Sequence, residues 1–461
     1  MATTAAPPGL DRFFKISERG STVRTEIIAG LATWLTMAYI LFVNPQILGF
    51  SGIKGLEPLG LPFPQVLTVT ALTAGVMTLA MGLFANYPFA LAAGLGLNAF
   101  VAFTLVAADK LSYPQAMGVI VAEGILITIF VLTGLREMVL NAIPMDLKRA
   151  IGIGIGLFIA IIGLVNGGIV VAGTGTIVTL NTNLRHWSIL VFAFGLVVTS
   201  ALVARRIKGA LLLGIVSTTI LATIINEAKH LTIWGNGIAA LPHKIVESPD
   251  FHLIGKFSFD FFSTLGFWTA VAVVISVMLS DFFDTMGTVI GIAGEANLLD
   301  ENGRLPGMNR VLLVDSLAAV AGGLTSSSSN TTYIESASGV SEGGRTGLTS
   351  VVVGILFLLS LFFSPIAGIV PPEATGPVLV IVGYFMMTIV REINWSDPGI
   401  GIPALLTMIV MPFTYSITNG VGAGFVSYVI VAVLRGRWRE VHPLLYAVAA
   451  IFLWYFIHGT V

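Results

Sequence analysis

Long apolar runs alternate with short polar connections along nearly the whole chain. The apolar spans cover residues 24–44, 65–84, 94–108, 114–134, 146–165, 187–204, 209–226, 266–292, 309–323, 333–341, 346–364, 376–391, 401–416 and 418–434. Most of them approach the roughly 20 residues that a helix needs to cross about 30 Å of hydrocarbon. The pattern therefore predicts an all-α polytopic membrane protein with about 14 transmembrane elements. We expect the shorter span 443–457 to lie in the interface or against the bundle.

Two of these spans are too short to cross a bilayer as helices. Residues 94–108 follow a non-helical stretch at 87–93, and residues 333–341 follow one at 326–332. Such backbone is tolerated at membrane depth only where protein or a water-filled cavity satisfies it. We therefore expect elements 3 and 10 to be part extended and part helical. Because seven is an odd number, two copies of seven elements must have opposite orientations in the membrane. The pattern therefore predicts a 7+7 inverted repeat, with substrate bound near the midplane where elements 3 and 10 meet.

The basic residues agree with this count. With the N-terminus in the cytoplasm, 17 of the 23 Lys and Arg residues, Arg136 among them, fall on the inner side. The remaining six fall outside, at Lys54, Lys110, Arg185, Lys229, Lys244 and Lys256. The positive-inside rule thus supports both ends of the 14 elements in the cytoplasm of a cell-membrane protein. We expect the first hydrophobic span to remain in the mature protein as its own insertion signal, since the residues before it lack a cleavable signal's pattern.

Composition excludes a soluble protein. The chain is 56% hydrophobic and 10% charged, with a mean hydropathy of +0.94, values that ordinary globular proteins do not reach. It has no cysteine, so disulfides and thiolate metal sites are excluded. We expect no metal, no cofactor and no nucleic-acid partner.

The eighth span carries two carboxyl groups on one helical face. Asp281, Asp284, Thr285 and Thr288 follow the spacing i, i+3, i+4 and i+7, which places them on one side of a helix. Carboxylates are costly inside a membrane and face a cavity or a partner. We expect Asp281 and Asp284 to take part in binding or proton coupling. The alternative is that one of them hydrogen-bonds a neighbouring broken helix.

The tenth element places Glu335 at or just inside a helix N-terminus, next to Thr332 and Tyr333. Backbone amides at such a terminus are donors for a polar ligand, and an ionisable residue at this depth indicates a functional site. The alternative is a helix-capping glutamate.

The third element resembles the tenth in its small residues. Gly94 and Gly96 permit close backbone approach, and Asn98 offers both donors and an acceptor. Phe89 and Phe100 could stack on a planar ligand, although core packing is the favoured alternative for both.

Two further acids lie inside spans. Glu123 in the fourth span is equally compatible with a site or a scaffold role, and Asp315 in the ninth is favoured as a hydrogen-bonding residue of the bundle. No histidine lies within a well-defined span, so carboxylates must carry any coupled proton.

Five runs resemble the nucleobase:cation symporter-2 superfamily, specifically its AzgA-like hypoxanthine/adenine/guanine permease branch. They are MAYILFVNP (Met37–Pro45), GLFANYPFALAAGLGLNAF (Gly82–Phe100), SDFFDTMGT (Ser280–Thr288), TTYIESASGVSEGGRTGLT (Thr331–Thr349) and MPFTYSITNG (Met411–Gly420). The resemblance implies a core domain of elements 1–4 and 8–11 and a gate domain of elements 5–7 and 12–14. It also implies a base bound between elements 3, 8 and 10, and a homodimer.

Carried over position by position, the resemblance assigns base binding to Asn98, Asp281 and Glu335, and a second functional aspartate to Asp284. It implies the following boundaries: 1–23 cytoplasmic N-terminal segment, 24–134 and 264–364 core, 135–227 and 365–436 gate, 228–263 extracytoplasmic connection, and 437–461 C-terminal hydrophobic segment. Thr332, Tyr333, Thr285 and Phe89 complete the predicted binding set, and Glu335, Asp281 and Asp284 the predicted proton-coupling set.

These features predict a secondary transporter that imports purine nucleobases with protons by alternating access, with Na⁺ as the open alternative for the coupling ion. The other hypotheses are a transporter of another small solute on the same fold (uracil, xanthine, sulfate or bicarbonate), a channel, and an intramembrane hydrolase. Three acids argue against an anion, which they would repel unless protonated. A hydrolase is disfavoured because Asp281 and Asp284 share one helix instead of facing each other.

Overall fold

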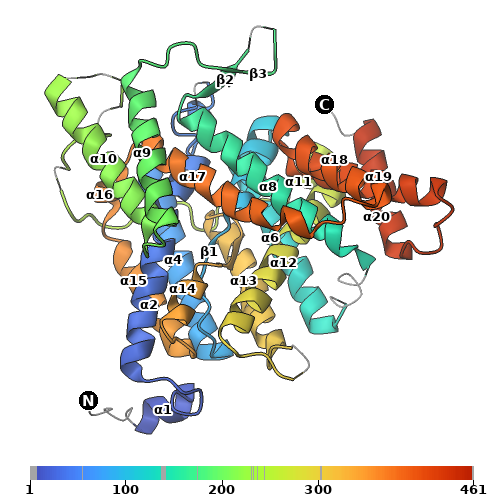
Figure 1. Cartoon of the computed structure of the whole chain (residues 1–461), viewed down its shortest axis with the longest axis horizontal. Coiled ribbons are helices and arrows are strands. Elements are labelled where there is room, and N and C mark those ends of the chain that lie inside the picture. Colours follow the sequence, from blue (N-terminus) through green and yellow to red (C-terminus); the bar gives the residue numbers. More distant parts are fainter. Residues whose placement is uncertain are drawn as a thin grey trace.

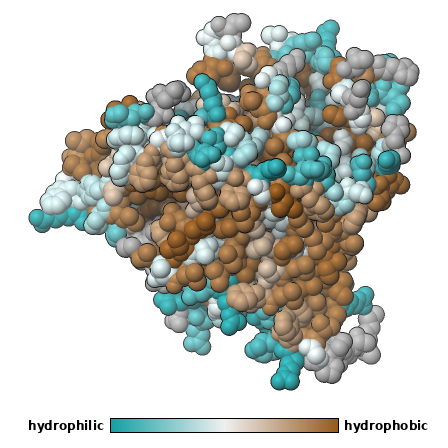
Figure 2. Space-filling view, turned by 180° about the vertical axis from the view of Figure 1, so that it is seen from behind, coloured by the Kyte–Doolittle hydropathy of each residue, from teal (hydrophilic) through white to brown (hydrophobic). Residues whose placement is uncertain are grey.

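The computed structural model describes residues 8–458 except 54, 136–141, 174, 230, 232, 236, 243 and 302–303. Lys54 and Arg136, which entered the charge count, lie outside the described residues. Within the described part, nine helices are long and apolar enough to cross a membrane by length and composition. Figure 2 shows hydrophobic side chains covering the flank of the molecule, with hydrophilic ones toward its upper and lower ends.

The first seven elements run from residue 23 to residue 229. They are α2 (Val23–Met37) with α3 (Ile40–Leu48), α4 (Phe63–Ala80) with the π-helix η2 (Met81–Ala85), β1 (Leu91–Ala93) with α5 (Leu95–Ala99) and the π-helix η3 (Phe100–Ala108), α6 (Tyr113–Thr133), α8 (Met145–Asn166), α9 (Trp187–Ala204) and α10 (Ala210–Lys229).

The second seven follow the same order. They are α12 (Phe267–Glu295), α13 (Met308–Thr325), β4 (Asn330–Thr332) with α14 (Ser336–Ser341), α15 (Gly347–Ser360), α17 (Pro372–Met387) with η4 (Thr388–Glu392), α18 (Pro398–Thr414) and α19 (Ile417–Leu434). Outside the repeats lie α1 (Pro8–Phe14), η1 (Glu57–Leu59), the hairpin β2 (Val170–Ala172) and β3 (Val178–Leu180), α11 (Phe261–Leu265), α16 (Ser364–Gly368) and α20 (Pro443–His458).

The two halves pack on each other in matching pairs (Figure 1). Helix α4 lies along α15, and α6 lies along α13, which are the same two repeat positions with the halves exchanged. Helix α8 likewise packs on α17 and α18. The C-terminal helix α20 lies against α12 and α19, as expected for a segment that packs on the bundle.

The broken elements 3 and 10 meet in the interior, where β1 and β4 form a two-stranded antiparallel sheet. Its register pairs Leu91 with Thr332, Ala92 with Thr331 and Ala93 with Asn330. All six of these residues are buried. Each strand thus gives the other the backbone partners that lipid cannot provide, and the predicted part-extended, part-helical form of both elements is confirmed.

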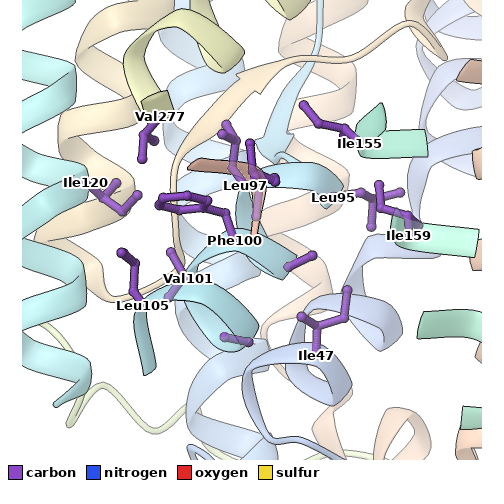
Figure 3. Packing of buried hydrophobic residues seen from close by; sticks show 14 of the residues in the cluster. Ile47, Leu95, Leu97, Phe100, Val101, Leu105, Ile120, Ile155, Ile159 and Val277 are labelled. Atoms are coloured by element: carbon purple, nitrogen blue, oxygen red, sulfur yellow. The ribbon is translucent and has the colours of Figure 1, made fainter. Parts of the chain in front are cut away.

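The helical part of element 3 lies in an apolar shell (Figure 3). Phe100 is fully buried and lies among Ile120 of α6, Val277 of α12 and Val101 of its own helix. Core packing, the favoured reading for this phenylalanine, is what the structure shows.

Candidate functional site

The serine run before β4 forms a tight, fully buried turn. Ser326 and Ser328 adopt left-handed backbone conformations, with φ of 62° and 72°. The Asn330 amide donates to Ser327 Oγ at 2.9 Å and to the Ser328 carbonyl at 3.1 Å, while Asn44 of α3 donates to the Ser327 carbonyl at 3.0 Å. Small polar residues are needed here because the backbone leaves its helix inside the protein, where each polar group requires a partner.

Glu335 lies at the start of α14, directly after the sheet. Its side chain is half-buried and makes no helix-capping hydrogen bond, so the capping alternative is excluded. Instead, Tyr39 donates to Glu335 Oε1 at 2.6 Å. The amides of Ser336 and Ala337, expected as ligand donors, already donate to the carbonyls of Tyr333 and Ile334.

Asp281 lies in the middle of α12 with its side chain 1% exposed. Its Oδ2 is 3.0 Å from Ser329 Oγ, which is also 2.8 Å from Oε1 of the fully buried Glu123. Asp281 Oδ1 and Glu123 Oε2 have no hydrogen-bond partner among the described residues. The structure therefore joins a predicted site residue to Glu123, whose role the sequence left open.

Asp315 binds the two predicted threonines. Its Oδ1 accepts from the amide of Thr332 at 2.9 Å and from the hydroxyl of Thr332 at 2.7 Å, and its Oδ2 accepts from Thr285 at 2.8 Å. The two hydroxyl hydrogens are thus committed to Asp315, which acts as the expected hydrogen-bonding residue of the bundle. Ligand binding by Thr332 and Thr285 stays a prediction.

Tyr333 extends the sheet contact between the broken elements. Its amide donates to the Ala90 carbonyl at 2.9 Å, and its hydroxyl donates to the Ala93 carbonyl at 2.5 Å. Both of its polar groups therefore hold element 10 on element 3, and its contact with a ligand stays a prediction.

Asn98 has a polar atom available for a ligand, whereas the ring of Phe89 is already packed. Asn98 is fully buried, and its Oδ1 has no partner in the described part of the chain. Phe89 is also fully buried but stacks on Tyr87, with ring centroids 5.4 Å apart, in an apolar cluster with Leu91 and Val289. The structure gives Phe89 a packing role, and its predicted contact with a ligand is untested.

Asp284 differs from Asp281 although both lie on α12. Its side chain is exposed and makes no hydrogen bond in the described part of the chain. Gly287, nearly one turn further on, is exposed as well, and a Cβ there would meet no atom within 4 Å. An aspartate inside a membrane helix does not face lipid, so we expect this face of α12 to line a water-filled cavity.

Two residues of the site were missed at the sequence level. Tyr39 lies within the MAYILFVNP run, which carried the family resemblance but no assigned role. Ser329 lies in the polar run that singled out element 10, and nothing distinguishes it there from Ser326, Ser327 and Ser328. Their partners, Glu335 and Glu123, are more than 200 positions away in the chain, so only the fold reveals them.

Comparison with known proteins identifies the family of the chain. A sequence model described as "Permease family" matches residues 24–423. The chain belongs to this family, the nucleobase:cation symporter-2 permeases. Its members are transporters, which excludes the hydrolase hypothesis.

The similar proteins cover nearly the whole chain. Adenine permease AdeQ of Escherichia coli is 42% identical over 445 residues, covering 96% of this chain and 95% of that protein. Guanine/hypoxanthine permease PbuG of Bacillus subtilis is 40% identical over 451 residues, covering 96% and 99%. Both lie within the branch that the sequence motifs resemble.

Solved structures share the fold at low identity. The transmembrane domain of the cyanobacterial bicarbonate transporter BicA aligns with a TM-score of 0.59 and 15% identity over 87% of this chain and 96% of that one. SLC26A9 aligns with a TM-score of 0.61 and 13% identity over 90% and 66%. The multi-pass 7+7 inverted-repeat fold with core and gate domains is thereby confirmed.

Proposed function

We propose that this permease imports purine nucleobases of the adenine, guanine and hypoxanthine class together with protons, by alternating access. The observation that carries the proposal is near 40% identity, over almost the whole chain, to proteins named adenine permease and guanine/hypoxanthine permease. The likeness to a bicarbonate transporter supports the fold alone, and the acids of the site disfavour an anion.

The proposed binding site lies between Asn98 of α5, Asp281 of α12 and Glu335 at the start of α14. Asn98 Oδ1 and Asp281 Oδ1 are buried acceptors without a partner among the residues that the structure describes. Glu335 is held by Tyr39 through one oxygen, which leaves the other for a ligand. A purine carries ring N–H groups, and some purines carry an amino group. The acceptors thus match the donors of a bare base, which needs few but well-satisfied polar partners.

The proposed transport cycle moves a core domain (24–134 and 264–364) against a gate domain (135–227 and 365–436), with 228–263 connecting them outside. The N-terminal segment 1–23 and the C-terminal segment 437–461 flank the domains. An aromatic cluster joins core to gate: Phe103 of η3 lies 6.2 Å from Phe158 of α8 and 6.0 Å from Tyr415 after α18, between ring centroids. With the N-terminus in the cytoplasm, this cluster lies toward the outer side.

The exposed Asp284 lies in the inner half of α12 under the same orientation. A site that is open to the cytoplasm requires a closed outer side and a water-accessible inner face, and the proposed cycle assigns these to the aromatic cluster and to the face of Asp284. In the proposed cycle, Glu335, Asp281 and Asp284 are the proton-coupling acids. Desolvation favours the neutral form of the carboxyl group of the buried Asp281. We further propose a homodimer in the cell membrane.

Uptake of radiolabelled hypoxanthine into proteoliposomes tests the proposal. Competition by adenine, guanine, xanthine, uracil, sulfate and bicarbonate, each with and without a protonophore, separates the proposal from its alternatives. We expect saturable uptake that purines inhibit and the protonophore abolishes, whereas Glu335→Gln abolishes proton-driven uptake. Normal accumulation by Glu335→Gln would contradict the role of Glu335, and flux without saturation would indicate a channel.

A further inference from the structure

Ser329 lies between two buried carboxyl groups that belong to different helices. Its Oγ is within hydrogen-bond distance of both Glu123 Oε1 and Asp281 Oδ2, at 2.8 and 3.0 Å. A serine hydroxyl has one hydrogen and can donate it to only one of the two oxygens. The second contact therefore needs a hydrogen from the carboxyl side. At least one of Glu123 and Asp281 is a protonated carboxylic acid in this arrangement.

Two other buried acids of the chain accept hydrogen bonds at both of their carboxyl oxygens. Each oxygen of Glu26 accepts from a backbone amide, those of Arg345 and Thr346, and each oxygen of Asp315 accepts at least one hydrogen bond. Glu123 and Asp281 instead leave one oxygen each without a donor in the described part of the chain. The pair thus lacks the donors that two negative charges would require when buried.

We propose that Glu123 joins Asp281 among the proton-coupling acids and exchanges the coupled proton with it through the hydroxyl of Ser329. In this step the Glu123 O–H bond breaks as its proton joins Ser329 Oγ, and the former Ser329 O–H bond breaks as its proton joins Asp281 Oδ2. One proton moves from Glu123 to Asp281, and one negative charge moves the opposite way. No redox partner is needed, and Ser329 is a hydroxyl before and after.

The same geometry gives a reason for coupling, which rests on the proposed purine function. A base N–H is bound best by an ionised Asp281, whose free Oδ1 accepts it. With Asp281 ionised, Glu123 must be protonated, since Ser329 can satisfy only one of two negative neighbours. The base-bound site therefore holds the proton of the pair on Glu123. Among the described residues, the titratable groups that face the pair from the packed elements are Asp315 of α13 and Asp284 of α12, both acidic.

The test uses purified full-length protein in proteoliposomes with radiolabelled hypoxanthine. Counterflow without a proton gradient reports binding and exchange, while uptake driven by an imposed gradient and lumenal acidification report coupling. Glu123→Gln keeps a neutral group of the same shape. We expect this variant to retain counterflow with a flattened pH profile and to lose both gradient-driven accumulation and hypoxanthine-dependent acidification. Ser329→Ala is expected to lose acidification as well.

Glu373→Gln is the matched control, because Glu373 is also buried within a membrane helix but accepts a hydrogen bond from Trp234 at 3.0 Å, away from the proposed site. It should retain accumulation and acidification. Wild-type protein without hypoxanthine counterflow would overturn the purine function itself. If the wild-type protein transports hypoxanthine, and Glu123→Gln shows the wild-type pH profile and normal acidification, the role of Glu123 is overturned while the purine function stands.

A second measurement covers the case in which Glu123→Gln does not fold. Infrared difference spectra of the wild-type protein, recorded on adding hypoxanthine, should show a change in the C=O band of a protonated carboxylic acid. Ser329→Ala retains both acids but removes the bridge, so it should alter that band. An identical difference band in wild-type protein and Ser329→Ala would overturn the proposal.

Discussion

The hydroxyl of Tyr39 donates a 2.6 Å hydrogen bond to Oε1 of Glu335 and so joins the first membrane element to the tenth. This contact fixes the orientation of Glu335 at the start of α14. The orientation of Glu335 is thus controlled from a segment that belongs to the other half of the repeat.

Tyr39→Phe is expected to weaken base binding while leaving the protein folded. A typical hydrogen bond contributes about 0.5–1.5 kcal/mol, which corresponds to a KM for hypoxanthine raised by roughly 2- to 10-fold. Tyr384→Phe is the control, because Tyr384 is exposed on α17. Concentration series of initial uptake rates measure the effect, and an unchanged KM in Tyr39→Phe would contradict it.

Asp315→Asn is expected to destabilise the protein. The carboxylate accepts hydrogen bonds at both oxygens from Thr332 and Thr285. The asparagine oxygen can replace only one of these acceptors, so the hydroxyl of Thr285 loses its acceptor and must turn its hydrogen toward Thr331 Oγ1, 2.6 Å away. Losing one such hydrogen bond costs about 0.5–1.5 kcal/mol. Thermal unfolding in detergent should show a clearly lower midpoint. Asp284→Asn is the control, because the Asp284 side chain makes no hydrogen bond in the described part of the chain, and this variant should unfold at the wild-type temperature. Equal unfolding midpoints for the two variants would contradict the prediction.

Gly96→Ala is expected to slow transport by interfering with the contact between α5 and α8. A Cβ at Gly96 would lie 2.4 Å from Ile155 Cγ2, a distance that side chains do not adopt. Because interdigitated helices tolerate little added volume, the maximal rate should fall while the protein remains folded. Gly152→Ala on α8 is the control, as its Cβ would meet nothing within 4 Å. The double variant Gly96→Ala/Ile155→Ala should recover the rate, and additive losses would contradict a direct clash.

Asp397 gives a pH-dependent prediction outside the membrane. The backbone amide of Gly399, 2.8 Å away, and the guanidinium of Arg435 lower the pKa of this carboxyl group below its ordinary value. A lowered folded-state pKa means that its stabilisation is present above the ordinary pKa and is lost as the pH falls through the folded-state value. Asp397→Asn keeps a good helix cap but removes the charge. The variant should be less stable than wild type at neutral pH, and the difference in melting temperature should vanish at acid pH.

Much of the architecture could be predicted because its physical basis is local. A run of apolar residues near the length of a bilayer marks an element wherever it lies, and the short lengths of 94–108 and 333–341 were sufficient to predict broken elements. Glu335 and Asp281 were found for the same reason, since an ionisable residue in an apolar span stands out without knowledge of its neighbours.

The hydrogen-bond partners could not be predicted because they join distant positions. Nothing near Thr332 indicates that Asp315 occupies its amide and hydroxyl, and nothing near Glu123 indicates that Ser329 lies between it and Asp281. Each of these outcomes depends on which elements are adjacent, and a single sequence does not contain that information.

The pairing of β1 with β4 has a consequence for how the protein is made. Strand β1 leaves the ribosome more than 200 residues before its partner, since Leu91 pairs with Thr332. Until then its amides and carbonyls have no strand partner, and hydrocarbon cannot supply one. The first half therefore cannot complete its own fold in lipid, and it must be sheltered by water, by the insertion machinery or by neighbouring helices until the second half arrives. Transport therefore requires synthesis to continue through element 10. In a chain truncated before residue 330, strand β1 has no partner and the first half stays incompletely folded.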